Sequence, residues 1–117
     1  MRISVRYGKE KPLPRTILLV ATNWFKKVGV ARINLVNNTY STYVESKVEG
    51  KGVAKALLLR VEIVLQKLAK STKKKFYHKV YFQTPEAKIR LERYLERFGS
   101  KLGYKKKGDI WYKEYKL

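Results

Sequence analysis

Two glycines, Gly50 and Gly52, stand one residue apart in a turn between a strand-like segment at 39–45 and an amphipathic segment at 53–70. Where a helix begins, several backbone N–H groups lack a partner within the helix, and the helix dipole adds positive charge. Glycines at such a turn adopt unusual backbone angles and let a phosphate approach without meeting a Cβ. The sequence Lys47-Val-Glu-Gly-Lys-Gly-Val-Ala54 therefore predicts an anion site made by backbone amides.

The established phosphate-binding signatures fit this turn poorly. Its spacing is G-x-G and not G-x-G-x-x-G, and no Lys-Ser or Lys-Thr pair follows. Neither a dinucleotide fingerprint nor a P-loop is therefore indicated. A Gly-Lys-Gly turn before a helix is also a common plain connector, and the turn alone leaves that alternative open.

Positive charge is the second marked property of the chain. Lys and Arg total 28 against 9 Asp and Glu, which gives a net charge of +19. Such a field attracts polyanions: nucleic acid, the phosphates of a cofactor or an anionic surface. The lysine runs at 73–75 and 105–107 are expected in loops, where they contact solvent or phosphate. An origin in a hot environment would explain the lysines but not the shortage of carboxylates, because thermophilic ion-pair networks need both signs.

The remaining composition excludes several classes of site. The absence of cysteine rules out disulfides and thiolate zinc sites, and a single histidine, His78, argues against a histidine metal site or a Ser-His triad. No run approaches the ~18–20 apolar residues that span a bilayer, and no signal-peptide segment is found near Met1. We expect a single domain over residues 1–117, cytoplasmic and without a membrane partner.

The segments before the turn have the pattern of strands. Residues 16–22, 28–36 and 39–45 are expected to form an antiparallel meander joined by short turns. Residues 1–15 are a basic lead-in that includes a short edge strand. Alternation in the third strand sends one set of side chains to each face. The two sets are Tyr40, Thr42 and Val44, and Ser41, Tyr43 and Glu45.

Two amphipathic segments predict helices. The first spans 53–70 and the second starts at Thr84-Pro85, an N-cap followed by a first-turn proline, and ends at Gly103. The expected buried stripe of the second helix is Ala87, Leu91, Tyr94, Leu95, Phe98 and Leu102. A strand at 78–83 should run parallel to the third strand, because a helix connects them. A turn at 107–109 leads into a last strand at 109–116. The prediction is an α/β fold with a mixed, mostly antiparallel sheet of about five to seven strands and two main helices.

The order of these segments resembles the GNAT acetyltransferase superfamily over residues 16–117. That family's Gln/Arg-x-x-Gly-x-Gly/Ala signature cradles the pyrophosphate of acetyl-coenzyme A, and Lys47, Gly50 and Gly52 occupy its positions. Leu102-Gly103-Tyr104 is similar to the family's Leu-Gly-Phe after the last helix, and 109–115 is similar to its closing strand. The resemblance implies an acyl-CoA N-acyltransferase-like fold and acetyl-CoA as cofactor.

The resemblance also implies which residues hold the cofactor. Amides between Val48 and Ala54 would bind the pyrophosphate, and the strand backbone around Val44 and Glu45 would pair with the pantetheine arm as peptides add to sheet edges. The candidate cofactor-binding residues are Val44, Lys47, Val48, Glu49, Gly50, Lys51, Gly52, Val53 and Ala54.

Acetylation of an amine needs a base for the nucleophile and a proton for the leaving thiolate. Glu45 closes the strand beside the cofactor turn and is the candidate base, ahead of Glu49; an exposed carboxylate paired with a lysine is the alternative for Glu45. Many GNAT members carry a tyrosine acid about four residues before the glycine of Gly-Phe, but Gly99 stands there. Tyr94, roughly a turn earlier, is the candidate substitute, with an aromatic at the core edge as the alternative. The helical segments that precede the meander in many members are also missing.

Two functions from different classes follow. The first is an acetyl-CoA-dependent N-acetyltransferase, whose amine acceptor is carried by a protein or by something anionic. The alternative is a non-catalytic GNAT-like scaffold that binds DNA or RNA through its basic surface. Tyr and Trp are plentiful among the lysines, as stacking platforms require, although their strand positions are also explained by packing. A helix-turn-helix is not expected, because a strand separates the two helices.

Overall fold

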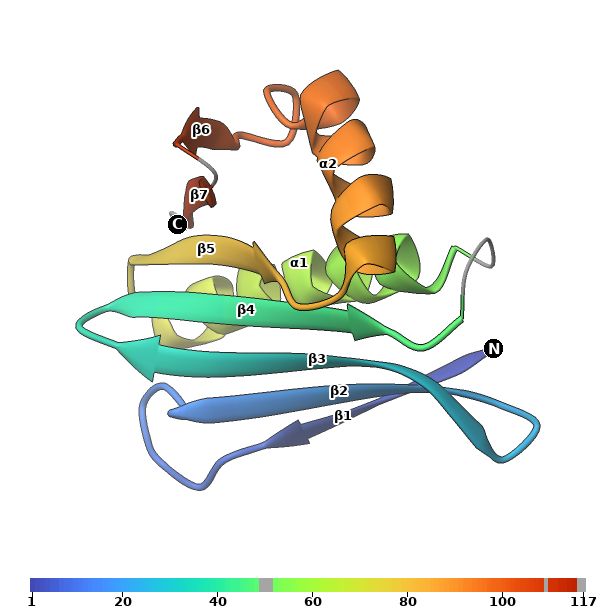
Figure 1. Cartoon of the computed structure of the whole chain (residues 1–117). Helices are drawn as coiled ribbons and strands as arrows, with labels where there is room; N and C mark the ends of the chain where they lie inside the picture. Colours follow the sequence, from blue (N-terminus) through green and yellow to red (C-terminus); the bar gives the residue numbers. More distant parts are fainter. Residues whose placement is uncertain (49–51, 109, 116–117) are drawn as a thin grey trace.

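The computed structural model describes residues 1–48, 52–108 and 110–115 and shows a sheet flanked by helices (Figure 1). The elements are β1 (Arg2–Tyr7), β2 (Thr16–Asn23), β3 (Lys26–Val36), β4 (Thr39–Ser46), α1 (Val53–Thr72), β5 (Phe76–Phe82), α2 (Pro85–Phe98), β6 (Lys105–Lys107) and β7 (Ile110–Tyr115). The predicted α/β class is confirmed. Within this part of the chain no helix combines the length and apolarity needed to cross a membrane.

The seven strands form one mixed sheet in the order β1-β2-β3-β4-β5-β7-β6. Strands β1 to β4 pair antiparallel as the predicted meander. Strand β5 runs parallel to β4, as expected for two strands joined through a helix. The terminal hairpin pairs with β5 through its second strand, β7. Asp109, in the predicted turn of that hairpin, lies outside the described residues.

Helix α1 packs on one face of the sheet, directly over Gly29 of β3. A Cβ added at Gly29 would lie 2.5 Å from Val53 Cγ1, so this position needs the smallest residue. Farther along, the carboxylate of Glu62 faces Lys113 of β7, with Oε1 and Nζ 3.9 Å apart. One helix therefore covers the sheet from β3 to β7, and Figure 1 shows it behind the strands.

Helix α2 packs on the same face. Its Glu92 carboxylate lies 3.7 Å from Nζ of Lys106, and Lys106 is opposite Trp111 in the β6–β7 register. Trp111 and Lys113 are two residues apart on β7 and therefore share a face, the one that α1 covers. The two helices form a single layer.

Among the described residues neither helix covers the opposite side of the sheet, which we call the open face. In β4 the predicted alternation is confirmed: Tyr40, Thr42 and Val44 are buried, whereas Tyr43 and Glu45 are half-buried. The Cα envelope of 36 × 32 × 20 Å is correspondingly flat. The segment before β2 forms strand β1 and a loop, and it supplies no helix that could cover the open face.

The regular part of α2 ends at Phe98, earlier than the predicted end at Gly103. The last turn instead closes as a Schellman motif: Tyr104 N–H donates to Gly99 O at 2.8 Å, and Gly103 N–H donates to Ser100 O at 3.2 Å. Gly103 takes the left-handed conformation, with φ of +90°, that this motif requires. Phe98 is 36% exposed and not part of the buried stripe, since the neighbouring Gly99 is the residue that packs against Trp111 there.

Candidate functional site

The start of α1 has the properties of an anion site. Its N-cap is Gly52, in the left-handed conformation with φ of 68° and ψ of 18°, and within the described part of the chain no side chain caps the helix. The first turn contains no acidic residue. The first hydrogen bond of the helix joins Ala56 N–H to Gly52 O at 3.0 Å, so the preceding amides have no partner within the helix. The amides of residues 53–55 point outward from the N-terminal end of the helix.

The predicted cofactor residues on either side of Gly52 differ in what the structure shows of them. Glu49, Gly50 and Lys51 lie outside the described residues. Val53 and Ala54 are each 3% exposed, so they offer backbone amides and not side chains to a ligand.

The residues that lead into the turn are partly engaged already. Lys47 N–H donates to Val28 O at 2.8 Å, and Val48 O accepts from the Ser46 hydroxyl at 2.8 Å. The Lys47 side chain is exposed. Lys47 can therefore contribute its charge, but not its amide, to an anion.

The edge of β4 becomes free close to this turn. The last hydrogen bond between β4 and β5 runs from Gln83 N–H to Val44 O, at 3.0 Å. Beyond it β5 ends and the chain enters α2, while β4 continues to Ser46. The Val44 carbonyl, predicted to pair with a pantetheine arm, is thus already paired. Among the residues that the structure describes, Ser46 is the position of β4 that faces the β5 side without a partner strand.

A groove of about 390 Å³ lies between α1 and α2, next to the first turn of α1. Its walls include the aromatic rings of Tyr94 and Phe98 and the ammonium groups of Lys55 and Lys101. Lys55 Nζ lies 5.1 Å from the centre of the Tyr94 ring. Partial burial raises the pKa of the Tyr94 hydroxyl, and the charge of Glu62 raises it further. The groove combines stacking surfaces with positive charge.

The two predicted catalytic side chains lie on opposite sides of the sheet. Glu45 is on the open face, where its Oε2 is 3.4 Å from Arg32 Nη1. Tyr94 is on the helix side, in the groove between α1 and α2. The structure therefore does not bring Glu45 and Tyr94 together.

Gly99, at the place of the expected tyrosine acid, has no room for one. A Cβ on Gly99 would lie 3.2 Å from Cζ3 of Trp111 and closer still to the carbonyl of Leu95. The absence of this acid is thus built into the packing of α2 on β7.

The open face beside Glu45 carries residues that sequence reasoning did not select. Tyr43 and Tyr81 lie directly opposite each other on β4 and β5, and their rings stack with centroids 4.9 Å apart at 14°. Arg32 approaches Glu45 from β3. The alternation of β4 places Tyr43 beside Glu45, but the pairing with Tyr81 depends on the β4–β5 register.

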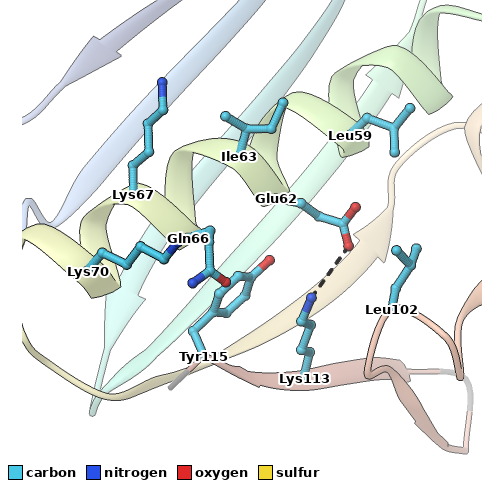
Figure 2. Close-up of a pocket in the computed structure, with 9 residues that line it drawn as sticks. All are labelled: Leu59, Glu62, Ile63, Gln66, Lys67, Lys70, Leu102, Lys113 and Tyr115. Atoms are coloured by element: carbon cyan, nitrogen blue, oxygen red, sulfur yellow. Dashed lines mark ion pairs between the residues drawn. The ribbon is translucent and has the colours of Figure 1, made fainter. Parts of the chain in front are cut away.

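A second groove, of about 610 Å³, lies between α1 and β7 (Figure 2). Leu59, Ile63 and Leu102 supply apolar walls around the Glu62–Lys113 pair. Burial raises the pKa of the Glu62 carboxyl, and Lys113 partly opposes that shift. None of the predicted site residues lines this groove. In the sequence, the groove is indicated only by the carboxylate of Glu62 next to the apolar stripe of 53–70.

His78 is wholly buried on the helix-covered face of the sheet. Its Nε2 lies 2.6 Å from the Thr42 hydroxyl and its Nδ1 lies 2.9 Å from the Tyr104 hydroxyl. Burial, assisted by the charge of Lys113, lowers the pKa of His78 to about 3. The imidazole is therefore a neutral hydrogen-bonding bridge that fastens the segment after α2 to the sheet.

No protein-family model and no curated protein sequence matches the chain. Solved structures do. The PaiA N-acetyltransferase of Thermoplasma acidophilum, in complex with coenzyme A, is 19% identical with a TM-score of 0.55, covering 89% of this chain but only 62% of its own. The ribosomal-protein-S18-alanine N-acetyltransferase of Escherichia coli is 12% identical with a TM-score of 0.60, covering 99% of this chain and 96% of its own.

A GNAT-family acetyltransferase of Streptococcus pneumoniae adds a third likeness, with 14% identity, a TM-score of 0.54 and coverage of 86% of this chain and 67% of its own. At these identities the likeness establishes a shared fold.

Proposed function

Because the chain has the fold of the GNAT N-acetyltransferases, we propose that it binds an acyl-coenzyme A, in the first instance acetyl-CoA, and transfers the acyl group to an amine. The observation that carries this proposal is the uncapped start of α1, with left-handed Gly52 and no acidic residue in the first turn. Free amides and the helix dipole there suit the pyrophosphate of the cofactor. A Cβ added at Gly52 would meet no atom of the described residues within 4 Å, which leaves room for a ligand beside the amides.

The neighbouring features suit the rest of such a cofactor. The partnerless position of β4 at Ser46 can hydrogen-bond one amide of the pantetheine arm. The groove between α1 and α2 offers Tyr94 and Phe98 for stacking with adenine, and Lys55 and Lys101 for the phosphate of the ribose. In this arrangement Tyr94 binds the cofactor and takes no part in proton transfer.

We assign the base to Glu45. Bound acetyl-CoA would supply an acyl group activated as a thioester. Glu45 would accept a proton from the attacking amine, which reaches it across the open face. The Arg32 guanidinium competes for the same carboxylate, so an incoming ammonium has to displace it. With Gly99 packed against Trp111, we assign the proton for the leaving thiolate to solvent.

The proposal is tested by calorimetric titration of the protein with acetyl-CoA. Gly52→Asp places a negative charge beside the α1 amides in a left-handed position, and we expect it to abolish measurable binding. Gly108→Asp is the matched control, because Gly108 also has positive φ (62°) and open space around its Cα, but lies in the β6–β7 turn. Equal affinity in the two variants would remove the site from the α1 turn.

Two observations support the alternative of a non-catalytic scaffold. Gly99 leaves no acid for the leaving thiolate, and Arg32 occupies the carboxylate of the candidate base Glu45. A protein that binds acetyl-CoA but releases no coenzyme A thiol with any amine offered would fit that alternative.

A further inference from the structure

The open face of the sheet combines aromatic rings with positive charge. Tyr43 and Tyr81 form the stacked pair on β4 and β5, and Tyr77 at the start of β5 is 46% exposed. Residues four apart on a strand are about 13 Å apart, so Tyr77 and Tyr81 sit along β5 at a distance that extended nucleotides can bridge. Tyr112 of β7 extends the surface, since it lies opposite Lys79 in the register.

Basic side chains surround these rings. Arg32, Lys79 and Lys105 lie on the open face of β3, β5 and β6, and Arg2 and Arg6 lie on the same face of the edge strand. Glu45 on this face is paired with Arg32, and Glu114 lies opposite Tyr77. The surface therefore remains positive, in a chain with a net charge of +19.

We propose that the open face binds single-stranded nucleic acid. Unstacked bases can lie on tyrosine rings while lysine and arginine neutralise the phosphates, and this combination needs no base-specific contact. A broad sheet cannot enter the grooves of a duplex, and a duplex keeps its bases stacked away from the rings. An acidic protein would use the basic groups but would leave the rings without a role. This proposal does not depend on acyl-CoA binding, which involves the helix side of the sheet and the α1 turn; only the proposed approach of the amine acceptor to Glu45 shares the open face.

The test is fluorescence anisotropy with end-labelled oligo(dT) and oligo(rU) of about 15 nucleotides, at low salt. We expect Tyr77→Ala to weaken binding roughly tenfold and Tyr77→Phe, which keeps the ring, to change it little. The matched control is Tyr7→Ala, since Tyr7 is a similarly exposed tyrosine (53%) whose register partner Ile17 faces the helix layer.

A second pair of variants separates the face from the overall charge. Lys79→Ala and Lys67→Ala remove the same charge, the first from the open face and the second from α1. We expect Lys79→Ala to weaken binding more and to reduce the salt slope by roughly one phosphate contact. Thermal unfolding of each variant verifies that it is folded.

Unlabelled competitors show whether binding depends on contacts with the bases or on phosphate charge alone. The proposal is supported when a single strand displaces the probe better than a duplex of equal length or inorganic polyphosphate. It is overturned when polyphosphate or duplex competes equally well, or when Tyr77→Ala and Tyr7→Ala bind alike. An unchanged acetyl-CoA titration with Tyr77→Ala keeps the two sites distinguishable.

Discussion

The carboxylate of Glu45 lies on the open face, 3.4 Å from the guanidinium of Arg32, and both side chains remain partly in contact with solvent. An exposed pair of this kind contributes little to stability, about 0–1 kcal/mol, so the proposed amine acceptor would displace Arg32 at small cost. Glu45 is thus held in position by Arg32 while its carboxylate stays accessible from solvent.

At the residue scale, Glu45→Gln should lower kcat by about a hundredfold with an alkylamine acceptor, because the general base is lost while the side-chain volume is retained. Release of coenzyme A thiol measures this rate. With an amine that is already neutral at pH 7, the same substitution should have little effect, since no proton has to be removed before attack. An equal loss with both amines would exclude a role as base.

Tyr94→Phe provides a contrasting residue-scale prediction. Because Tyr94 lies on the helix side, away from Glu45, we expect kcat to stay within about twofold. A loss of tenfold or more, assayed by thiol release with acetyl-CoA at saturation, would restore Tyr94 as the acid.

His78 predicts a pH dependence of stability. Its pKa is lowered from 6.5 to about 3 on folding, so the unfolded chain binds a proton first as the pH falls. The stabilisation is therefore complete above pH 6.5 and is lost as the pH falls toward 3, with a slope of at most about 1.4 kcal/mol for each pH unit.

Urea unfolding at a series of pH values measures this slope. His78→Gln keeps hydrogen-bonding capacity toward Thr42 and Tyr104 but does not titrate, so it should be less stable at pH 7 and less sensitive to acid. Identical slopes in the two proteins would assign the acid sensitivity to the carboxylates.

At the scale of elements, the position of the α1 start depends on β3. An added Cβ at Gly29 would lie 2.5 Å from Val53 Cγ1 and 3.0 Å from Leu57 Cδ1. Close-packed interiors respond to such overlap by moving an element or straining side chains. The position of the α1 amides is therefore fixed by a residue of β3 that lies outside the proposed anion site.

Gly29→Ala should lower the unfolding free energy by about 1–3 kcal/mol and weaken acetyl-CoA binding. Adding Val53→Ala removes the nearest clash, so the double variant should recover part of both losses, a coupling that urea unfolding and calorimetry can measure. Strictly additive effects would show that α1 is not seated on Gly29.

At the scale of the whole molecule, charge repulsion is the dominant electrostatic term. The described side chains form few ion pairs, among them Arg32–Glu45 and Glu62–Lys113, against a net charge of +19. Salt screens exposed charges over a Debye length of about 10 Å at 0.1 M. Screening should therefore favour the compact state more than it weakens attractive pairs.

We expect Tm to rise as KCl is increased from about 0.02 M to 0.2 M, a range in which screening changes strongly. Differential scanning calorimetry measures this directly, with an uncharged osmolyte at equal osmolality as the control. A Tm that falls with salt would mean that attractive pairs dominate.

The sequence by itself determined both helices, most of the strands and their order, but the lysine run at 105–107, expected in a loop, forms strand β6. Alternation in 39–45 predicted which side chains of β4 share a face, and helical spacing in 53–70 predicted α1, because these periodicities are local consequences of backbone geometry. The parallel pairing of β4 and β5 followed from the connecting helix. The glycine before α1 was also predictable, since an uncapped left-handed helix start is a local feature.

The tertiary structure decided everything that depends on which distant residues meet. Sequence could not place both helices on one face, pair Tyr43 with Tyr81, or show that Trp111 fills the space at Gly99. It joined Glu45 and Tyr94 in one mechanism, whereas the sheet separates them. The reason is physical: periodicity fixes the direction of a side chain relative to its own strand or helix, but contacts between elements depend on register and on the volume that packing leaves free.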